Sequence, residues 1–251
     1  MEELGADAHF VTSLDDIAWI YNMRGQDIAC SPVIQAYTMI TLNQAILFVQ
    51  DGVLNKEQKE ELEKEKIYVK DYKEIIRFTE NLPACVLLLD PDKVSDELYH
   101  SFSDKVKKIE EMDPSVRMKA VKNSAEIAQL RSAHLRDGIA MTRYMYWLKH
   151  LPEEVHVTEM EAAAYLEELR KEQEGYLEPS FETISAYGAN AAMCHYISTE
   201  ETDTEIRKEG FYLVDAGGQY RAGTTDITRT IVMGNVTEEQ KLHYTLVLKG
   251  M

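Results

Sequence analysis

The sequence predicts a chain in two parts, an α/β part followed by an α+β part. Up to about residue 110, short β-rich runs alternate with helical segments, which is typical of an α/β fold. From residue 124, two long helical segments come first and several strand-like runs follow them, which is the order of an α+β fold. We expect the boundary between residues 112 and 124, and we place it so that the parts cover 1–117 and 118–251.

Three regions of the first part are predicted to be β-structure. Residues 8–13 and 84–91 are each one strand, and the second run is apolar enough to be buried before Pro91 stops it. Residues 35–52 predict a hairpin, because two β-rich runs are joined through Leu42-Asn43.

The segments between these strands are helical or solvated. Residues 15–25 follow the first strand and close in a turn at Gly25. Residues 55–66 are almost wholly charged, so they are predicted to be a solvated helix or loop without a face to bury. Residues 71–82 predict a short helix. The alternation of strands and helices is what indicates the α/β class.

The second part opens with two helices. Residues 124–151 predict a long helix, and four residues lie on its apolar face: Met141, Tyr144, Met145 and Leu148. The next helix begins with Thr158 and Glu161, which form a capping box in the sequence, and it is expected to stop at Gly175. Two successive helices of this kind can cover one face of a sheet.

Four strand-like runs and a last helix complete the second part. Thr237 is expected to begin the last helix. The strand-like runs are residues 180–188, 191–198, 211–217 and 226–234. Because these runs follow each other without intervening helices, we expect them to pair antiparallel.

The composition is that of a globular protein, and the net charge disfavours negatively charged partners. Apolar residues make up 45% of the chain and charged residues 28%, as in an ordinary globular protein. The net charge of −17 argues against nucleic acids and anionic membranes as partners, because their phosphates would be repelled. The acidic excess can also be a plain solubility feature.

Cysteine usage and the first residues indicate a cytoplasmic protein. Cys30, Cys85 and Cys194 are too few and too scattered for a disulfide framework or a cysteine-rich zinc site, which fits a reducing compartment. No apolar run approaches the ~18 residues of a membrane span. The opening stretch MEELGADAHF has acidic residues where a secretory signal has basic ones.

Two aspartates near the end of the chain form the candidate site. Asp215 ends an apolar run, and Asp226 opens a Thr-rich run after a Gly-rich turn. If the runs pair as a hairpin, the carboxylates can stand opposite each other and repel, unless a proton or a cation lies between them. The alternative is turn chemistry, in which each Asp bonds the local backbone. The hydroxyls of TTDITRT could hold carboxylates that bind Mn²⁺ or Mg²⁺.

These motifs resemble those of the Xaa-Pro aminopeptidases, metallopeptidases of the pita-bread fold that prolidase, methionine aminopeptidase and creatinase share. VDAGGQYRAGTTDITRT is similar to the family signature, NAAMCHY to its His-Tyr strand, and AEIAQLRSAHLRDGIA to the first helix of its catalytic domain. TSLDDIAWIYNMRGQDI and SPVIQAYTMI resemble the middle domain of the three-domain members. The resemblance spans nearly the whole chain.

The resemblance implies a role for three residues. Asp215 would chelate one metal ion, Asp226 would bridge two, and His195 would contact the substrate near the scissile bond. Cys194 beside His195 could suggest a Cys-His nucleophile, but nothing orients such a pair, so we interpret Cys194 as a packed small residue. The family takes a further His and two Glu ligands from later positions. We therefore expect this chain to be an internal piece of a longer enzyme, with an incomplete middle domain and the first half of the pita-bread domain.

The implied activity is removal of the N-terminal residue from peptides with proline in second position, by an enzyme with two divalent ions for which we expect Mn²⁺. The piece alone is expected to bind Mn²⁺ weakly and to be inactive. The resemblance also implies a cytoplasmic homodimer at full length. The alternatives are an Xaa-Pro dipeptidase, a pita-bread protein-binding module without catalysis, and a purely structural α/β piece.

Overall fold

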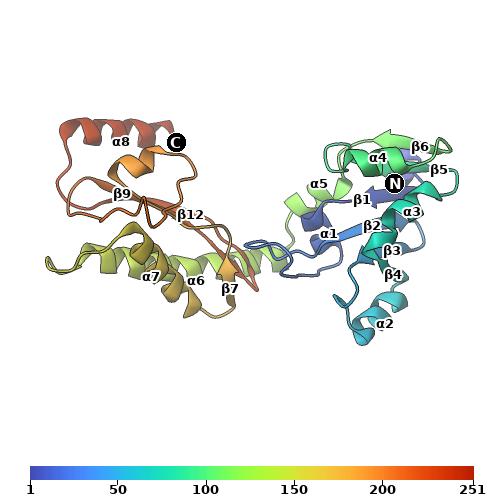
Figure 1. Ribbon diagram of the computed structural model, residues 1–251, viewed down its shortest axis with the longest axis horizontal. Coiled ribbons are helices and arrows are strands. Elements are labelled where there is room, and N and C mark those ends of the chain that lie inside the picture. Colours follow the sequence, from blue (N-terminus) through green and yellow to red (C-terminus); the bar gives the residue numbers. More distant parts are fainter. The chain divides into compact units, whose positions relative to one another are not determined.

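A computed structural model describes residues 1–251, and the chain divides into two compact units, Met1–Lys122 and Asn123–Met251 (Figure 1). The division falls inside the interval of residues 112 to 124 that the change in sequence character indicates. The domain ends at 117 and 118 stay a prediction.

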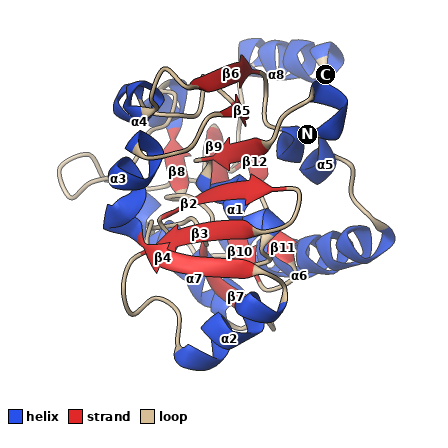
Figure 2. Ribbon diagram, turned by 90° about the vertical axis from the view of Figure 1, so that its right-hand side faces the viewer, coloured by secondary structure: helices blue, strands red, loops and turns tan.

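The first unit is built on one mixed sheet. Its six strands are β1 (Ala8–Val11), β2 (Ala36–Thr41), β3 (Ala45–Val49), β4 (Ile67–Asp71), β5 (Cys85–Leu89) and β6 (Val106–Glu110). They lie in the order β4-β3-β2-β1-β5-β6, and Figure 2 shows β2, β3 and β4 side by side. The pairs β1/β2 and β2/β3 are antiparallel, whereas β1/β5, β5/β6 and β3/β4 are parallel. The predicted hairpin is therefore confirmed as β2 and β3, with Ile40 opposite Ala45.

Helices line both faces of this sheet. They are α1 (Leu14–Ile20), α2 (Lys56–Lys64), α3 (Ile75–Glu80), α4 (Asp96–Ser101) and α5 (Pro114–Ala120), with the 3-10 turns η1 (Glu2–Leu4) and η2 (Tyr72–Glu74). Along β1, Phe10 packs in one apolar cluster with α3 and α4, and its neighbour Val11 packs in another with α1. Adjacent residues of a strand face opposite sides, so burial on both faces explains why strands such as β5 are nearly continuous apolar runs.

The charged segment 55–66 is a helix. Asn55 and Gln58 form a capping box at the start of α2, and the helix has no buried residue. The sequence interpretation missed β4 and β6 because both are edge strands, whose charged residues hide the β pattern.

The second unit combines helices with two small antiparallel sheets. Its elements are α6 (Ser124–Lys149), α7 (Glu159–Lys171), β7 (Tyr176–Pro179), β8 (Ile184–Tyr187), η3 (Gly188–Ala192), β9 (Phe211–Ala216), β10 (Gly218–Tyr220), β11 (Gly223–Thr224), β12 (Ile227–Val232) and α8 (Glu238–Gly250). One sheet has the order β12-β9-β8 and the other β11-β10-β7. Helices α6 and α7 lie side by side (Figure 1). The capping boxes at Thr158/Glu161 and Thr237/Gln240 begin α7 and α8.

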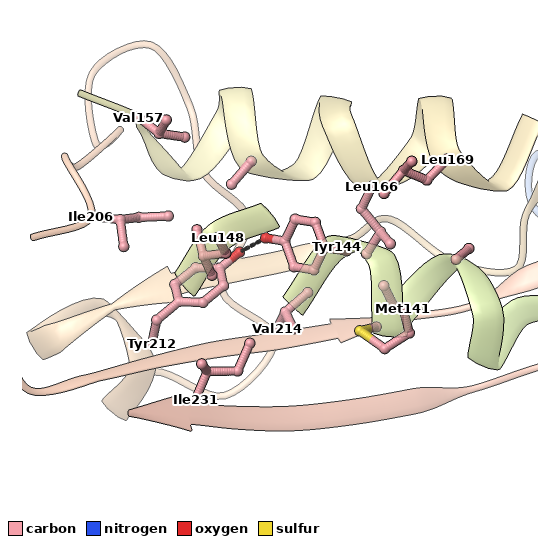
Figure 3. Packing of buried hydrophobic residues seen from close by; sticks show 13 residues of the cluster. Met141, Tyr144, Leu148, Val157, Leu166, Leu169, Ile206, Tyr212, Val214 and Ile231 are labelled. Atoms are coloured by element: carbon pink, nitrogen blue, oxygen red, sulfur yellow. Dashed lines mark hydrogen bonds between the residues drawn. The ribbon is translucent and has the colours of Figure 1, made fainter. Parts of the chain in front are cut away.

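The core of the second unit lies between these two helices and the β12-β9-β8 sheet. Figure 3 shows residues of α6, α7, β9 and β12 pointing into one apolar layer. On α6, Met141, Tyr144 and Leu148 are buried and Met145 is partly buried, which confirms the predicted face. Within this core the hydroxyls of Tyr144 and Tyr212 lie 2.7 Å apart, and the hydroxyl of Tyr212 also lies 2.6 Å from that of Ser185.

Two predictions about the strands of the second unit are wrong. Residues 191–198 do not form a strand; the 3-10 turn η3 and a turn occupy this segment, and its Tyr196 and Ser198 side chains bond Glu159 at the start of α7. The Gly-rich stretch between β9 and β12 is not a simple turn, since it contains the small hairpin β10-β11 paired with β7.

The buried tyrosine pair predicts a loss of stability at high pH. Burial raises the pKa of Tyr212 to about 12 and that of Tyr144 well above its ordinary value. The neutral phenol is therefore favoured in the folded state, and its contribution is complete below pH ~10, the unfolded pKa, and is lost as the pH rises toward 12. We expect the urea midpoint, followed by circular dichroism, to fall between pH 8 and pH 11, and to fall less in Tyr212→Phe. An equal fall in both proteins would contradict this assignment.

Candidate active site

The two aspartates lie on the same face of the β12-β9-β8 sheet. Asp215 is in β9, and its partner across the ladder is Thr228 of β12. Asp226 directly precedes β12, and continuing the register from the pair Ile227–Ala216 places it two residues from Thr228. The prediction that the aspartates stand directly opposite each other is therefore wrong by two residues, but residues two apart share a face, so the carboxylates are diagonal neighbours.

The two carboxylates are close enough to interact. Burial and the charge of Asp215 raise the pKa of Asp226 above its ordinary value, and the two side chains are hydrogen-bonded when Asp226 is protonated. Thr228 Oγ1 donates a hydrogen bond of 2.7 Å to Oδ1 of Asp215. This contact is the kind of hydroxyl-to-carboxylate bond expected from the Thr-rich run.

Close backbone packing brings Asp226 back to the end of β9. A Cβ atom at Gly217 would lie 2.0 Å from the carbonyl oxygen of Thr225, so only glycine allows this approach. The hydroxyl of Ser180 donates a bond of 2.8 Å to the same carbonyl. The hydroxyl of Thr225 in turn donates a bond of 2.7 Å to Oδ2 of buried Asp137. The residue before Asp226 is therefore fixed on both its backbone and its side chain.

Asp137 belongs to a buried ion pair between the two helices. Arg170 Nε on α7 lies 2.6 Å from Oδ1 of Asp137 on α6, and both side chains are at most 1% exposed. The hydroxyl of Tyr220 donates a further bond of 3.1 Å to Oδ1. This cluster connects the helix layer to the β10-β11 hairpin that precedes Asp226.

His195 makes no polar contact with the two aspartates. It follows η3, is exposed, and has a left-handed backbone with φ of 56°. It has no hydrogen bond or ion pair with Asp215 or Asp226, although η3 contacts β8 and β9. Cys194 beside it is exposed, so the interpretation of Cys194 as a packed residue is wrong.

The donor set suits a hard divalent cation. Asp215 and Asp226 offer carboxylate oxygens on neighbouring strands, and a cation between them would relieve the repulsion that raises the Asp226 pKa. The chain holds no group of three or more His, Cys, Asp or Glu side chains placed to bind a metal ion. The two aspartates fit part of a metal site.

The sequence interpretation missed the residues that support the site. Asp137, Arg170 and Thr225 form the cluster described above, and Glu159 holds the segment that contains His195. The capping box at Thr158 and Glu161 locates the start of α7 but cannot reveal that Glu159, within it, is buried.

Profiles of two protein families match this chain. The Creatinase/Prolidase N-terminal domain matches residues 1–126, and Metallopeptidase family M24 matches residues 128–251. No helix of the chain is both long and apolar enough to cross a membrane.

Curated relatives are named as Xaa-Pro aminopeptidases. The Probable Xaa-Pro aminopeptidase P of Verticillium alfalfae is 41% identical over 251 residues, which cover 96% of this chain and 41% of that protein. The Xaa-Pro aminopeptidase ApepP of Drosophila melanogaster is 37% identical over 254 residues, which cover 100% of this chain and 41% of that protein. This chain thus spans about two fifths of the length of these relatives.

Two solved structures are similar to this chain over almost its whole length. The X-prolyl aminopeptidase of Caenorhabditis elegans, described as a cytosolic enzyme with a di-nuclear active site, superposes with a TM-score of 0.94 at 30% identity, over 99% of this chain and 42% of that one. The prolidase of Pyrococcus furiosus superposes with a TM-score of 0.72 at 26% identity, over 99% of this chain and 68% of that one. The fold class expected from the sequence is confirmed, and the chain belongs to the family of the Creatinase/Prolidase N-terminal domain, with that domain followed by a pita-bread domain that metallopeptidase family M24 matches.

Proposed function

We propose that the full-length protein is a metal-dependent Xaa-Pro aminopeptidase, which releases the first residue of a peptide whose second residue is proline. The observation that carries the proposal is the pair Asp215 and Asp226, close together on one face of β9 and β12, within the part of the chain that metallopeptidase family M24 matches. The similarity to relatives of this name over the whole chain supports the same activity.

Each of the three site residues has a role in this proposal. Asp215 and Asp226 would hold the metal ions through their carboxylate oxygens, while Thr228 holds Asp215 in orientation. When bound, the ions supply Lewis-acid chemistry, lowering the pKa of water toward neutrality and polarising the scissile carbonyl. His195 contacts the substrate beside the scissile bond and can hold the proton that the leaving proline nitrogen takes up.

The proposal also covers the identity of the metal, the cellular location and the oligomeric state. Oxygen donors favour a hard ion, and we propose Mn²⁺ as the metal. The cytosolic, di-nuclear relative from Caenorhabditis elegans supports two ions and a cytoplasmic location. A homodimer at full length follows from the family resemblance, and light scattering of the purified protein tests it.

The decisive experiment is hydrolysis by the full-length protein with metal analysis on the same samples. We expect release of the first residue from a peptide of the type Xaa-Pro-Xaa, dependence on a divalent ion, and two ions per chain. Preference for the dipeptide Xaa-Pro over the longer peptide would favour the dipeptidase alternative. Absence of both metal and hydrolysis would favour the non-catalytic binding module.

The His195→Ala variant tests the assignment of His195 to substrate rather than metal. We expect two ions to remain bound while kcat falls about 100-fold, the scale of a lost acid–base group. The exposed His243, on α8, provides a matched control, and we expect His243→Ala to retain the wild-type rate. Loss of metal in His195→Ala would show that the residue is a ligand.

A further inference from the structure

Glu159 is a buried carboxylate without a cationic partner. It is the first residue of α7 and is 0% exposed, yet it forms no ion pair. Its oxygens instead accept hydrogen bonds from four residues: from the backbone N–H of Tyr187 (2.5 Å), and from the side chains of Asn190 (3.1 and 3.2 Å), Tyr196 (2.8 Å) and Ser198 (3.3 Å). The N-terminus of a helix also favours a negative charge at this position.

All four donors come from the segment 187–198, which contains His195. Tyr196 is 4% exposed and its hydroxyl is bonded to Glu159, whereas the preceding His195 is exposed. At His195 the backbone leaves the extended conformation, with a φ of 56°, a left-handed value that non-glycine residues rarely adopt. Such a conformation persists where the surrounding contacts hold it.

The chemistry of these contacts requires a carboxylate. A carboxylate offers about four lone-pair positions and no donor, so it can accept from all of these groups at once. An amide of the same shape would place its NH₂ group against the NH₂ of Asn190 in either orientation, because Asn190 Nδ2 lies within 3.2 Å of both carboxylate oxygens. One side chain on α7 thus fixes the segment on both sides of His195.

We propose that Glu159 is a positioning residue for His195: its buried carboxylate holds the segment 187–198 so that the exposed imidazole faces the substrate. The proposal rests on the substrate role of His195 in the proposed function. Glu159 touches neither substrate nor metal, and it acts only through His195.

A double-mutant cycle in the metal-loaded full-length enzyme tests this proposal. We expect Glu159→Gln to lower kcat for an Xaa-Pro-Xaa peptide by about 100-fold, because misplacement of a reacting group by about 1 Å has an effect of that size. Two ions should remain bound. In the His195→Ala background the same substitution should have no further effect on kcat, since residues that act as one unit are not additive.

Glu161→Gln is the matched control. Glu161 is exposed in the same first turn of α7, and its carboxylate accepts a bond of 3.0 Å from the N–H of Thr158, which a Gln side chain can also accept. The variant removes one charge from the same turn without touching the segment 187–198, so kcat should not change. A full Glu159→Gln loss that persists in the His195→Ala background, or no loss at all, would overturn the proposal.

Hydrogen exchange separates a failure of this proposal from a failure of the proposed function. In Glu159→Gln we expect the amides of residues 188–198 to exchange faster, whether or not the protein hydrolyses peptides. Unchanged exchange rates would contradict the proposal that Glu159 holds this segment. An inactive wild-type protein would contradict only the proposed aminopeptidase activity. If Glu159→Gln does not fold, Tyr196→Phe removes the 2.8 Å bond to Glu159 together with the contacts of the same hydroxyl to Asn190 and Thr202, leaves the carboxylate in place, and should show both effects in weaker form.

Discussion

Replacing Asp226 by Asn in the full-length protein should abolish binding of both metal ions and lower kcat/KM by more than about 100-fold, beyond the roughly 10- to 100-fold effect of losing a residue that only hydrogen-bonds a metal ligand. The amide keeps the shape of the side chain but removes the charge that we propose bridges the two ions. Metal analysis and hydrolysis of an Xaa-Pro-Xaa peptide on the same preparation measure both effects.

Comparison variants make this result specific. Asp215→Asn should lose one ion. Thr228→Val should reduce the affinity for metal about 10-fold, because this substitution removes only the 2.7 Å bond to Asp215. Asp203→Asn removes a carboxylate of the same unit that accepts the N–H of Met160, a bond an amide can keep, and should behave as wild type. Full activity with two ions in Asp226→Asn would show that its role is misassigned.

Replacing Arg170 by Met should destabilise the second unit by about 3–5 kcal/mol, because it leaves the Asp137 carboxylate buried without its cation. Both side chains are at most 1% exposed, and the pair is bidentate, with distances of 2.6 and 3.2 Å. Urea unfolding followed by Trp147 fluorescence in a Trp19→Phe background reports on this unit, because Trp147 packs against its core.

The same two helices provide the control. Arg143 of α6 and Glu172, which follows α7, form an ion pair of 2.5 Å whose side chains are 48% and 56% exposed. Arg143→Met should cost less than about 1 kcal/mol, as exposed pairs do. In Arg170→Met, replacing Asp137 by Asn should recover part of the loss, since no buried charge remains. Equal effects of Arg170→Met and Arg143→Met would mean that burial of the pair has no energetic consequence.

Several elements could be predicted because their signals are local. The capping boxes at Thr158 and Thr237 involve residues three apart, and the face of α6 around Tyr144 repeats every three or four residues. The hairpin of β2 and β3 and the buried strand β5 are likewise visible in short runs. The edge strands β4 and β6 were not predicted, because their charged residues resemble those of a solvated segment.

The site was predictable only in part. The motif around Asp215 and Asp226 made both aspartates candidates, and alternation along paired strands correctly implied a shared face. The register differed because the stretch between them folds as the β10-β11 hairpin, where Thr225 packs against Gly217. The segment around His195 was predicted as a strand because its apolar residues suit one, whereas its polar side chains bond Glu159.

The sequence by itself determined the long helices α6 and α7, the two-part organisation and the candidate aspartates, because these depend on spacing, capping and a contiguous motif. Only the tertiary structure decided which charged residues are buried. Glu159 and Glu161 are indistinguishable by type and spacing on α7, yet Glu159 meets Tyr196 across 37 residues while Glu161 stays in solvent. Asp137 likewise meets Thr225 across 88 residues. A buried carboxylate is stable only where donors converge on it from distant parts of the chain, and that convergence exists only in the folded protein.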